Sequence, residues 1–174
     1  NSYQYSFYVP QDVHGLIKLK GGDKKFVERL DELFETELSY EKIKEHEDIA
    51  GLIGQYAHGN EPSHHIAYLY NYAGEPWRTQ ARIRQIMDTL SSDKPDGLAG
   101  NDDVGQMSAW YIFSAMGFYP VSPGDLTYAL GAPQLPKISL ALANNKQFTV
   151  VAKGLSKKNK YRKEVRLNGK KLER

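Results

Sequence analysis

The sequence predicts a mainly α-helical fold that is followed by a β-rich C-terminal region. Up to about residue 120, apolar residues recur at the three-to-four-residue spacing of helices. Beyond Pro120 they occur in short, alternating runs, which favour strands. Residues 1–121 are therefore expected to form helical hairpins, and residues 122–174 to form a few antiparallel strands.

Each expected helix combines an apolar face with residues that begin or end helices. Asp23 follows Gly21-Gly22 and can cap a helix that carries Phe26 and Leu30 on one face. Further helices are expected after a loop within residues 40–55, from Pro62 to Gly74, from Pro76 to Leu90, and from Asp102 or Asp103 to Gly117.

The expected strands are separated by residues that favour turns. They cover Ile138–Leu142, Gln147–Val151 and Glu164–Leu167. Asn144-Asn145 and Asn168-Gly169 are turn signals between or after them.

Composition excludes several classes of protein. Of the 174 residues, 40% are hydrophobic and 25% are charged, which is enough to build a core. The sequence has no apolar run long enough for a membrane-spanning helix, so no membrane insertion is expected. With no cysteine, it can form neither a disulfide nor a thiolate metal site.

The positive charge is concentrated near the C-terminus. Residues 153–174 carry ten basic and two acidic residues, whereas residues 1–152 carry 13 basic and 19 acidic ones. Such a run can bind nucleic acid, but a solvated, lysine-rich surface hairpin is the favoured interpretation because only Tyr161 offers an aromatic platform. No nucleic-acid partner is expected.

Two similar tripeptides point to a functional site. Gly59-Asn60-Glu61 and Gly100-Asn101-Asp102 lie 41 residues apart, and each ends a loop and opens a helix. Two helices lie between them, so the second loop should return to the same end of an up-and-down helical array. The alternative is that they are two unrelated helix caps, because Asn and Asp favour such positions.

The acidic residues of these loops allow two kinds of chemistry. Paired carboxylates serve as acid and base in glycoside hydrolysis, and carboxylates with amide oxygens bind calcium; the candidates are Glu61, Asp102 and Asp103. Nearby, His64 and His65 point about 100° apart on a helix, so both cannot easily hold one metal ion. One is expected to contact a polar substrate while the other packs, although a structural role fits either. Phosphate-binding, nucleophile-elbow and dinucleotide motifs are absent.

The motifs around these residues resemble a known family. Residues 59–68 (GNEPSHHIAY), 100–111 (GNDDVGQMSAWY) and 116–121 (MGFYPV) are similar to the glycoside hydrolase family 92 α-mannosidases, as are residues 1–5 and 9–13. Two positions depart from the family pattern: Val104 stands where cysteine is common, and Gln11 where histidine is common.

This resemblance implies an exo-acting, calcium-dependent, inverting α-mannosidase that acts on α-1,2-linked mannose of N-glycans or mannan. It also implies that residues 1–121 are the C-terminal part of an (α/α)6 catalytic barrel. The general base is placed at Asp103, with Asp102 less favoured. The remaining roles are metal binding by Asn60 and Glu61, and substrate contact by Asn101, His64, His65, His46 and Glu47.

The resemblance further implies a larger enzyme. The family's general acid is a Glu in a Tyr-x-Glu-Gly segment just before the position of Asn1, so the 174 residues alone are expected to be inactive. The expected partners are a mannose-containing oligosaccharide and the rest of the enzyme, namely an N-terminal β-sandwich and the first barrel helices. A periplasmic, secreted or cell-surface location is expected, although no signal peptide is visible. The alternatives are a non-catalytic helical module that binds carbohydrate or calcium, and another (α/α)6 glycosidase.

Overall fold

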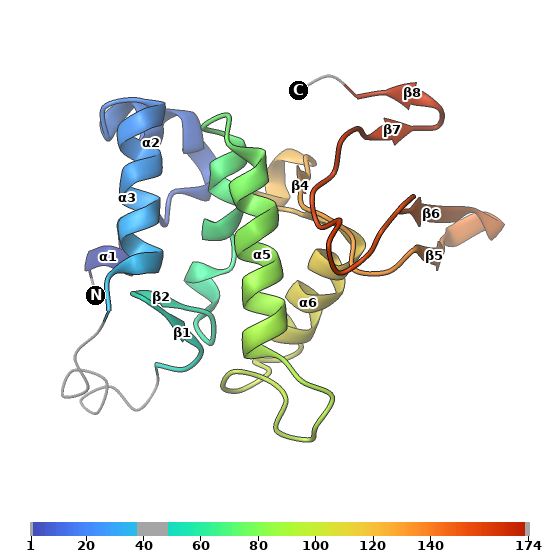
Figure 1. Cartoon of the computed structure of the whole chain (residues 1–174), viewed down its shortest axis with the longest axis horizontal. Coiled ribbons are helices and arrows are strands. Elements are labelled where there is room, and N and C mark those ends of the chain that lie inside the picture. The colour runs from blue at the N-terminus through green and yellow to red at the C-terminus, as the bar shows by residue number, and fades with distance from the viewer. Residues whose placement is uncertain (1, 38–48, 173–174) are drawn as a thin grey trace.

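A helical body and the β-hairpins that project from it make up the described part of the chain. The computed structural model describes residues 2–37 and 49–172 (Figure 1). Three helices exceed ten residues within these ranges, and the C-terminal hairpins extend away from them. No helix in these ranges has the length and apolar character that a bilayer crossing requires.

The helices follow the predicted order, with additional short ones at the N-terminus. The α-helices are α1 (Ser2–Tyr5), α2 (Val13–Leu19), α3 (Asp23–Glu35), α5 (Pro76–Leu90) and α6 (Gln106–Met116). The short 3₁₀ helices are η1 (Pro10–Asp12), η2 (Glu61–Ser63), η3 (Ile66–Asn71), η4 (Pro123–Asp125) and η5 (Ala143–Asn145). The predictions of a helix after Gly21-Gly22 and of one from Pro76 to Leu90 are confirmed, but the N-cap residue of α3 is Gly22, and Asp23 is its first helical residue. The arrangement agrees with part of an (α/α)6 barrel.

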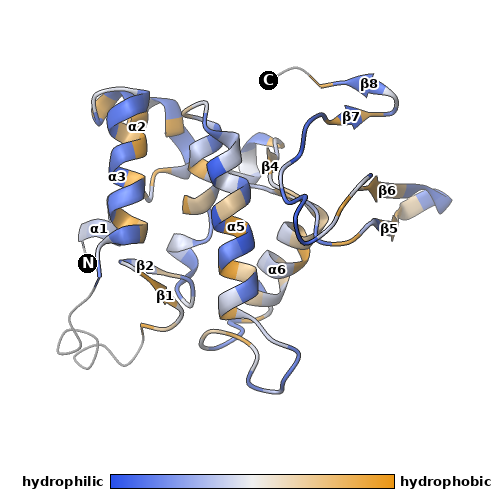
Figure 2. Cartoon of the chain, viewed as in Figure 1, coloured by the Kyte–Doolittle hydropathy of each residue, from blue (hydrophilic) through white to orange (hydrophobic). Residues whose placement is uncertain are grey.

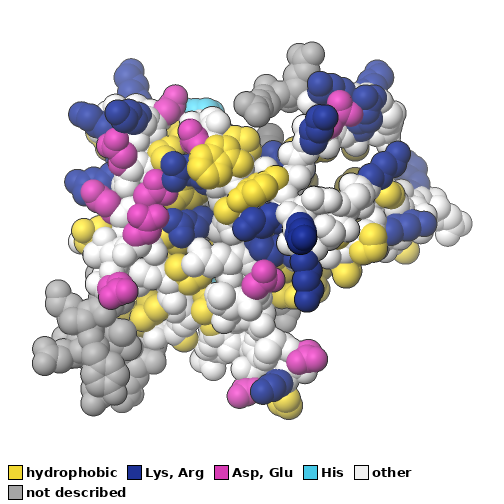
Figure 3. Space-filling view, in the orientation of Figure 1, with side chains coloured by type: hydrophobic (Ala, Val, Ile, Leu, Met, Phe, Trp, Pro, Cys, Tyr) yellow, Lys and Arg dark blue, Asp and Glu magenta, His cyan; other side chains and the backbone are white. Residues whose placement is uncertain are grey.

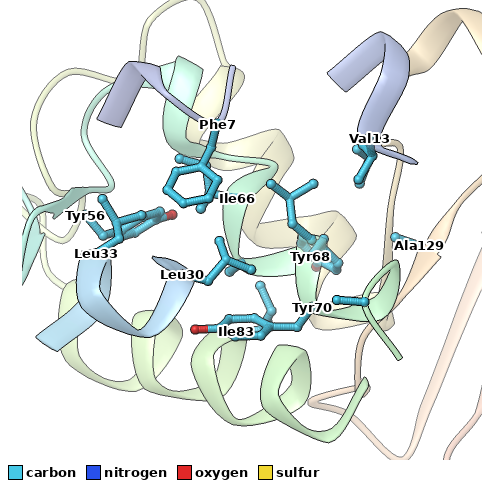
Figure 4. Close-up of a cluster of buried hydrophobic side chains, with 14 of the residues drawn as sticks. Phe7, Val13, Leu30, Leu33, Tyr56, Ile66, Tyr68, Tyr70, Ile83 and Ala129 are labelled. Carbon is cyan, nitrogen blue, oxygen red and sulfur yellow. The ribbon is translucent and has the colours of Figure 1, made fainter. Parts of the chain in front are cut away.

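The core lies where α3, η3 and α5 meet (Figure 4). Leu30 and Leu33 of α3 and Ile83 of α5 are at most 1% exposed, and they surround the side chains of η3. Apolar and polar bands alternate on α3 and α5 because one face of each helix is buried (Figure 2).

The helix expected from Pro62 to Gly74 is wrong: this segment forms η2 and η3 instead. All five residues 66–70 are completely buried, on every side of the chain. A 3₁₀ helix has three residues per turn, so it directs consecutive side chains in three directions. In this segment all three directions lead into the hydrophobic core. Gly74, at φ +79°, follows this segment as expected.

The helix expected within residues 40–55 is also wrong over residues 49–55, the part of this range that the structure describes. Strands β1 (Leu52–Ile53) and β2 (Tyr56–Ala57) form a hairpin, and residues 38–48 lie outside the described ranges. Gly54 has φ +58° at the turn, and a Cβ there would lie 2.6 Å from the Phe34 backbone. Glycine is therefore required at this tip.

The start of α6 also differs from the prediction. Neither Asp102 nor Asp103 is its N-cap residue; that position is held by Gly105, at φ +93°, because the chain turns sharply before the helix. Gly117 ends the helix as predicted, with φ +92°.

The remaining strands form three antiparallel hairpins. They are β3 (Phe118–Tyr119) with β4 (Ala129–Leu130), β5 (Lys137–Ala141) with β6 (Gln147–Val151), and β7 (Arg166–Leu167) with β8 (Lys170–Lys171). The predicted Asn144-Asn145 turn is present, with positive φ at both residues, as is the Asn168-Gly169 turn. The division into domains at residues 121 and 122 stays a prediction.

Arg162 ties the basic C-terminal segment to the rest of the described chain. The Arg162 backbone N–H donates to Gln80 Oε1 at 2.7 Å, and its Nη1 donates to the Gly131 carbonyl at 2.6 Å. Lys and Arg side chains also gather over the β7–β8 hairpin of this segment (Figure 3).

Replacing Leu30 tests the core. We expect Leu30→Ala to lower stability by about 2–5 kcal/mol because it leaves a cavity between α3 and α5. Thermal unfolding of the protein that carries this chain measures the change. Leu19→Ala, at a position 85% exposed on α2, is the control and should leave the melting temperature nearly unchanged. Equal effects of the two substitutions would contradict this placement of the core.

Candidate active site

The two Gly-Asn-acid loops lie against each other, as their spacing predicted. A Cβ added to Gly59 would lie 2.4 Å from the Ala99 carbonyl oxygen, immediately before Gly100. The Gly59 N–H donates to the Ala50 carbonyl at 3.0 Å, which extends the β1–β2 pairing into the first loop. Backbone contact thus brings together two segments that are 41 residues apart in the sequence.

This contact places Glu61 and Asp103 within hydrogen-bonding distance of each other. The hydrogen bond is the largest cause that raises the pKa of Asp103, and the negative charges of Glu61 and Asp102 add to the increase. The same bond lowers the pKa of Glu61. The two side chains thus interact directly, and the pKa values of the two carboxyl groups are shifted in opposite directions.

Asp102 faces the start of α6. Its Oδ1 accepts from the Ser108 backbone N–H at 3.0 Å and from the Ser108 hydroxyl at 2.9 Å. Sequence reasoning could not separate Asp102 from Asp103. The structure gives the two neighbours different partners.

His64 lies near Asp103 and is a neutral ring. It is 1% exposed; its Nε2 donates to the His58 carbonyl at 2.9 Å, and its Nδ1 accepts from the Gln106 side-chain amide at 3.2 Å. Burial is the main reason that its pKa is lowered to about 4. The amide of Gln106, at the first position of α6, also lies 3.4 Å from the Tyr119 hydroxyl.

His65 faces away from this network. It is 5% exposed, and its Nε2 donates to the Phe7 carbonyl at 2.9 Å, which ties the N-terminal segment to η3. Burial lowers its pKa as well. The predicted roles of His64 and His65 in substrate binding stay predictions.

Sequence reasoning missed His58. This residue is 2% exposed, its Nδ1 lies 3.0 Å from the Tyr56 hydroxyl, and its ring packs edge-on against Trp110 with centroids 4.3 Å apart. Burial lowers its pKa to about 3, so it too is neutral near pH 7. The indole N–H of Trp110 donates to the His64 carbonyl at 2.9 Å, so α6 is joined directly to the first loop. The position of His58 immediately before Gly59 was the sequence signal that could have identified it as part of the site.

The other predicted site residues occupy less defined positions. Asn60 is partly buried at the start of η2, where its side chain makes no capping bond, and Asn101 is exposed. His46 and Glu47 lie outside the described residues.

The carboxyl pair suits a hard cation, but it does not make a complete cage. Within residues 2–37 and 49–172, no three His, Asp or Glu side chains form a potential metal-binding group. Glu61 and Asp103 nevertheless offer the oxygen ligands and the negative charge that calcium prefers. Further oxygen ligands would have to complete the coordination.

Comparison with known proteins identifies the chain's relatives. The model of the glycosyl hydrolase family 92 catalytic domain matches residues 1–174. The chain is 33% identical over 175 residues to an Arthroderma benhamiae protein named "uncharacterized secreted glycosidase", and the match covers 99% of this chain and 20% of that protein.

Solved structures show the same similarity. The family GH92 α-mannosidase BT3965 from Bacteroides thetaiotaomicron, in complex with mannoimidazole, matches with a TM-score of 0.90 and 49% identity over 98% of this chain and 22% of its own. The family GH92 inverting mannosidase BT2199 from the same organism matches with a TM-score of 0.82 and 38% identity, covering 99% and 24% of the two chains. The chain thus spans 20% to 24% of the length of these three relatives.

The buried histidine rings make stability depend on pH. In the folded state the pKa of His64 lies near 4, whereas an unfolded histidine titrates near 6.5, so between these values the unfolded chain binds more protons. We expect stability to fall as pH decreases from 6.5 toward 4, by up to about 1.4 kcal/mol per pH unit from this residue. Thermal unfolding at pH 7 and pH 5 measures the loss.

A matched pair of variants assigns this effect. His64→Gln should reduce the difference between the two melting temperatures, whereas His14→Gln, at an exposed position on α2, should preserve it. An unchanged pH dependence in His64→Gln would contradict the assignment.

Proposed function

Because this chain belongs to glycosyl hydrolase family 92, we propose that the enzyme of which it forms part is an exo-acting, inverting α-mannosidase. The observation that carries the proposal is the carboxyl pair of Glu61 and Asp103 where the two family motifs meet. The relatives' names support the substrate class, since they describe a mannosidase bound to mannoimidazole and an inverting mannosidase.

Asp103 is the proposed general base. An inverting reaction needs a carboxylate that accepts a proton from the attacking water. The Asp103 side chain is exposed, while that of Asp102 is bound to Ser108. Because it is exposed, the Asp103 carboxylate can accept a proton from water.

Glu61 is not the matching acid. In inverting enzymes the two carboxyl groups lie about 6.5–9.5 Å apart, which leaves room for the water. Carboxyl groups that share a hydrogen bond are too close for this arrangement. The resemblance to the family places the acid in a Tyr-x-Glu-Gly segment before the position of Asn1, and we therefore expect the 174 residues alone to have no measurable activity.

Calcium is the proposed cofactor. Glu61 and Asn60 would hold it, with Asp103 beside them and additional oxygen ligands from elsewhere in the enzyme. When bound, the ion would supply positive charge that keeps the neighbouring carboxyls ionised and binds sugar hydroxyl oxygens. The protein's own contribution is to fix Glu61 through the contact between the two loops.

Substrate contacts are proposed for the residues around the pair. Asn101 is exposed beside Asp102, and His64 holds Gln106 beneath the site. His65, His46 and Glu47 complete the proposed set. We further propose α-1,2-linked mannose of N-glycans or mannan as substrate. An extracytoplasmic location agrees with the name of the secreted relative.

Replacement of the base tests the proposed reaction. In the full-length enzyme, we expect Asp103→Asn to retain the fold and to lower kcat by about 10²- to 10⁴-fold, the usual contribution of a general base. Asp88→Asn, at an exposed position on α5, is the control. NMR of a fresh wild-type reaction should show β-mannose first. Initial release of α-mannose would contradict inversion, and full activity of Asp103→Asn would contradict the base assignment.

Removal of the metal tests the cofactor separately. We expect a chelator to abolish activity and added calcium to restore it, because the proposed ligands are oxygens. Glu61→Gln should need more calcium than the wild type for half-maximal activity, whereas Glu28→Gln, exposed on α3, should not. Full activity in excess chelator would argue against calcium while leaving the hydrolase assignment intact.

A further inference from the structure

Asp102 connects the catalytic loop to the first turn of α6. Its Oδ1 accepts both the backbone N–H and the hydroxyl of Ser108, at 3.0 and 2.9 Å. Its main-chain carbonyl accepts from the Met107 N–H at 3.2 Å. Both the backbone and the side chain of this one residue are thus bound to the same helical turn.

The backbone that follows Asp102 is strained. Asp103, Val104 and Gly105 have φ values of +47°, +58° and +93°, so three consecutive residues lie in the left-handed region. This conformation is unfavourable for a β-branched residue, and the fully exposed Val104 side chain makes no packing contact that could stabilise it. Residues 103–105 are therefore held in this conformation by the bonds of Asp102 on one side and by α6 on the other.

The other end of this connection is also fixed. Trp110 of α6 donates its indole N–H to the His64 carbonyl at 2.9 Å, so the helix is bound to the chain that follows Glu61. Asp102 thus binds the loop that carries Asp103 to α6. The same helix is bound, through Trp110, to His64, three residues after Glu61.

We propose that Asp102 is a positioning residue that holds Asp103 against Glu61 through its bonds to Ser108. This role rests on the proposed function of Asp103 as the base. It differs from the alternative, in which Asp102 itself accepts the proton from water. The two roles require different properties of the side chain: positioning needs a hydrogen-bond acceptor, whereas a base needs an ionisable carboxylate.

Conservative and non-conservative substitutions distinguish these roles in the full-length enzyme. Asp102→Asn keeps a side-chain oxygen for Ser108 but cannot act as a base, and Asn replaces Asp well at such capping positions. We expect its kcat to stay within about threefold of the wild type. Asp102→Ala should lower kcat by about 10²-fold, the scale of a misplaced catalytic group, with little change in KM. Ser108→Ala keeps the backbone donor and should give a smaller loss.

A second aspartate provides a matched control. The Oδ1 of Asp125 accepts from the Thr127 N–H at 2.8 Å and from its hydroxyl at 2.7 Å, the same type of contact outside the two loops. Asp125→Ala should leave kcat unchanged. If Asp102→Asn loses as much activity as Asp103→Asn, or if Asp102→Ala retains full kcat, the positioning role is overturned.

Hydrogen exchange tests the connection without measuring catalysis. Amide exchange in residues 103–108 should be faster in Asp102→Ala than in the wild type and nearly unchanged in Asp102→Asn. Equal exchange in all three proteins would overturn the proposed connection even if the enzyme proved not to be a mannosidase. Absence of mannosidase activity in the wild type would instead overturn the proposed function.

Discussion

The close approach of two backbones at Gly59 is the constraint on which the site depends. A side chain at this position would collide with the Ala99 carbonyl, so only glycine lets the two loops meet. Their contact brings Glu61 to Asp103, and the Gln106 amide donates to His64 nearby. The hydrophobic core includes Tyr56 and Ile66, which lie on either side of the first loop in the sequence.

The site separates charged groups from neutral ones. Its negative charge resides on partly or fully exposed carboxyls, while the rings below them, His58 and His64, are buried and uncharged near pH 7. The hydrogen-bond partners of both rings are neutral groups, a tyrosine hydroxyl for His58 and a carbonyl and an amide for His64. The supporting layer therefore orients the loops without cancelling the charge that a cation or a polar substrate would meet.

Local patterns in the sequence predicted the elements that have a single buried face. The apolar spacing of α3 and α5 and the glycine after α6 were sufficient, and the 41-residue interval predicted that the two loops would meet. Periodicity failed at residues 66–70, because a segment that is buried on all sides has no polar face to mark its period. It also failed at Leu52 and Ile53, where Gly54 reverses the chain against α3.

The functional distinction between neighbouring residues was harder to predict. Asp102 and Asp103 are the same residue type in one motif, and only the left-handed backbone that follows sends their carboxyls to different partners. The role of His58 depends on Tyr56 and Trp110, which no local pattern places beside it. Such information lies in backbone conformation and in long-range packing.

The indole of Trp110 gives the site a built-in optical signal. This chain has two tryptophans, of which Trp77 is 49% exposed on α5, while Trp110 is fully buried and donates its N–H to the His64 carbonyl. A water-soluble quencher reaches the first ring and not the second. The fluorescence that survives quenching therefore comes, within this chain, from the ring that joins α6 to His64, and its emission wavelength reports whether water reaches that junction.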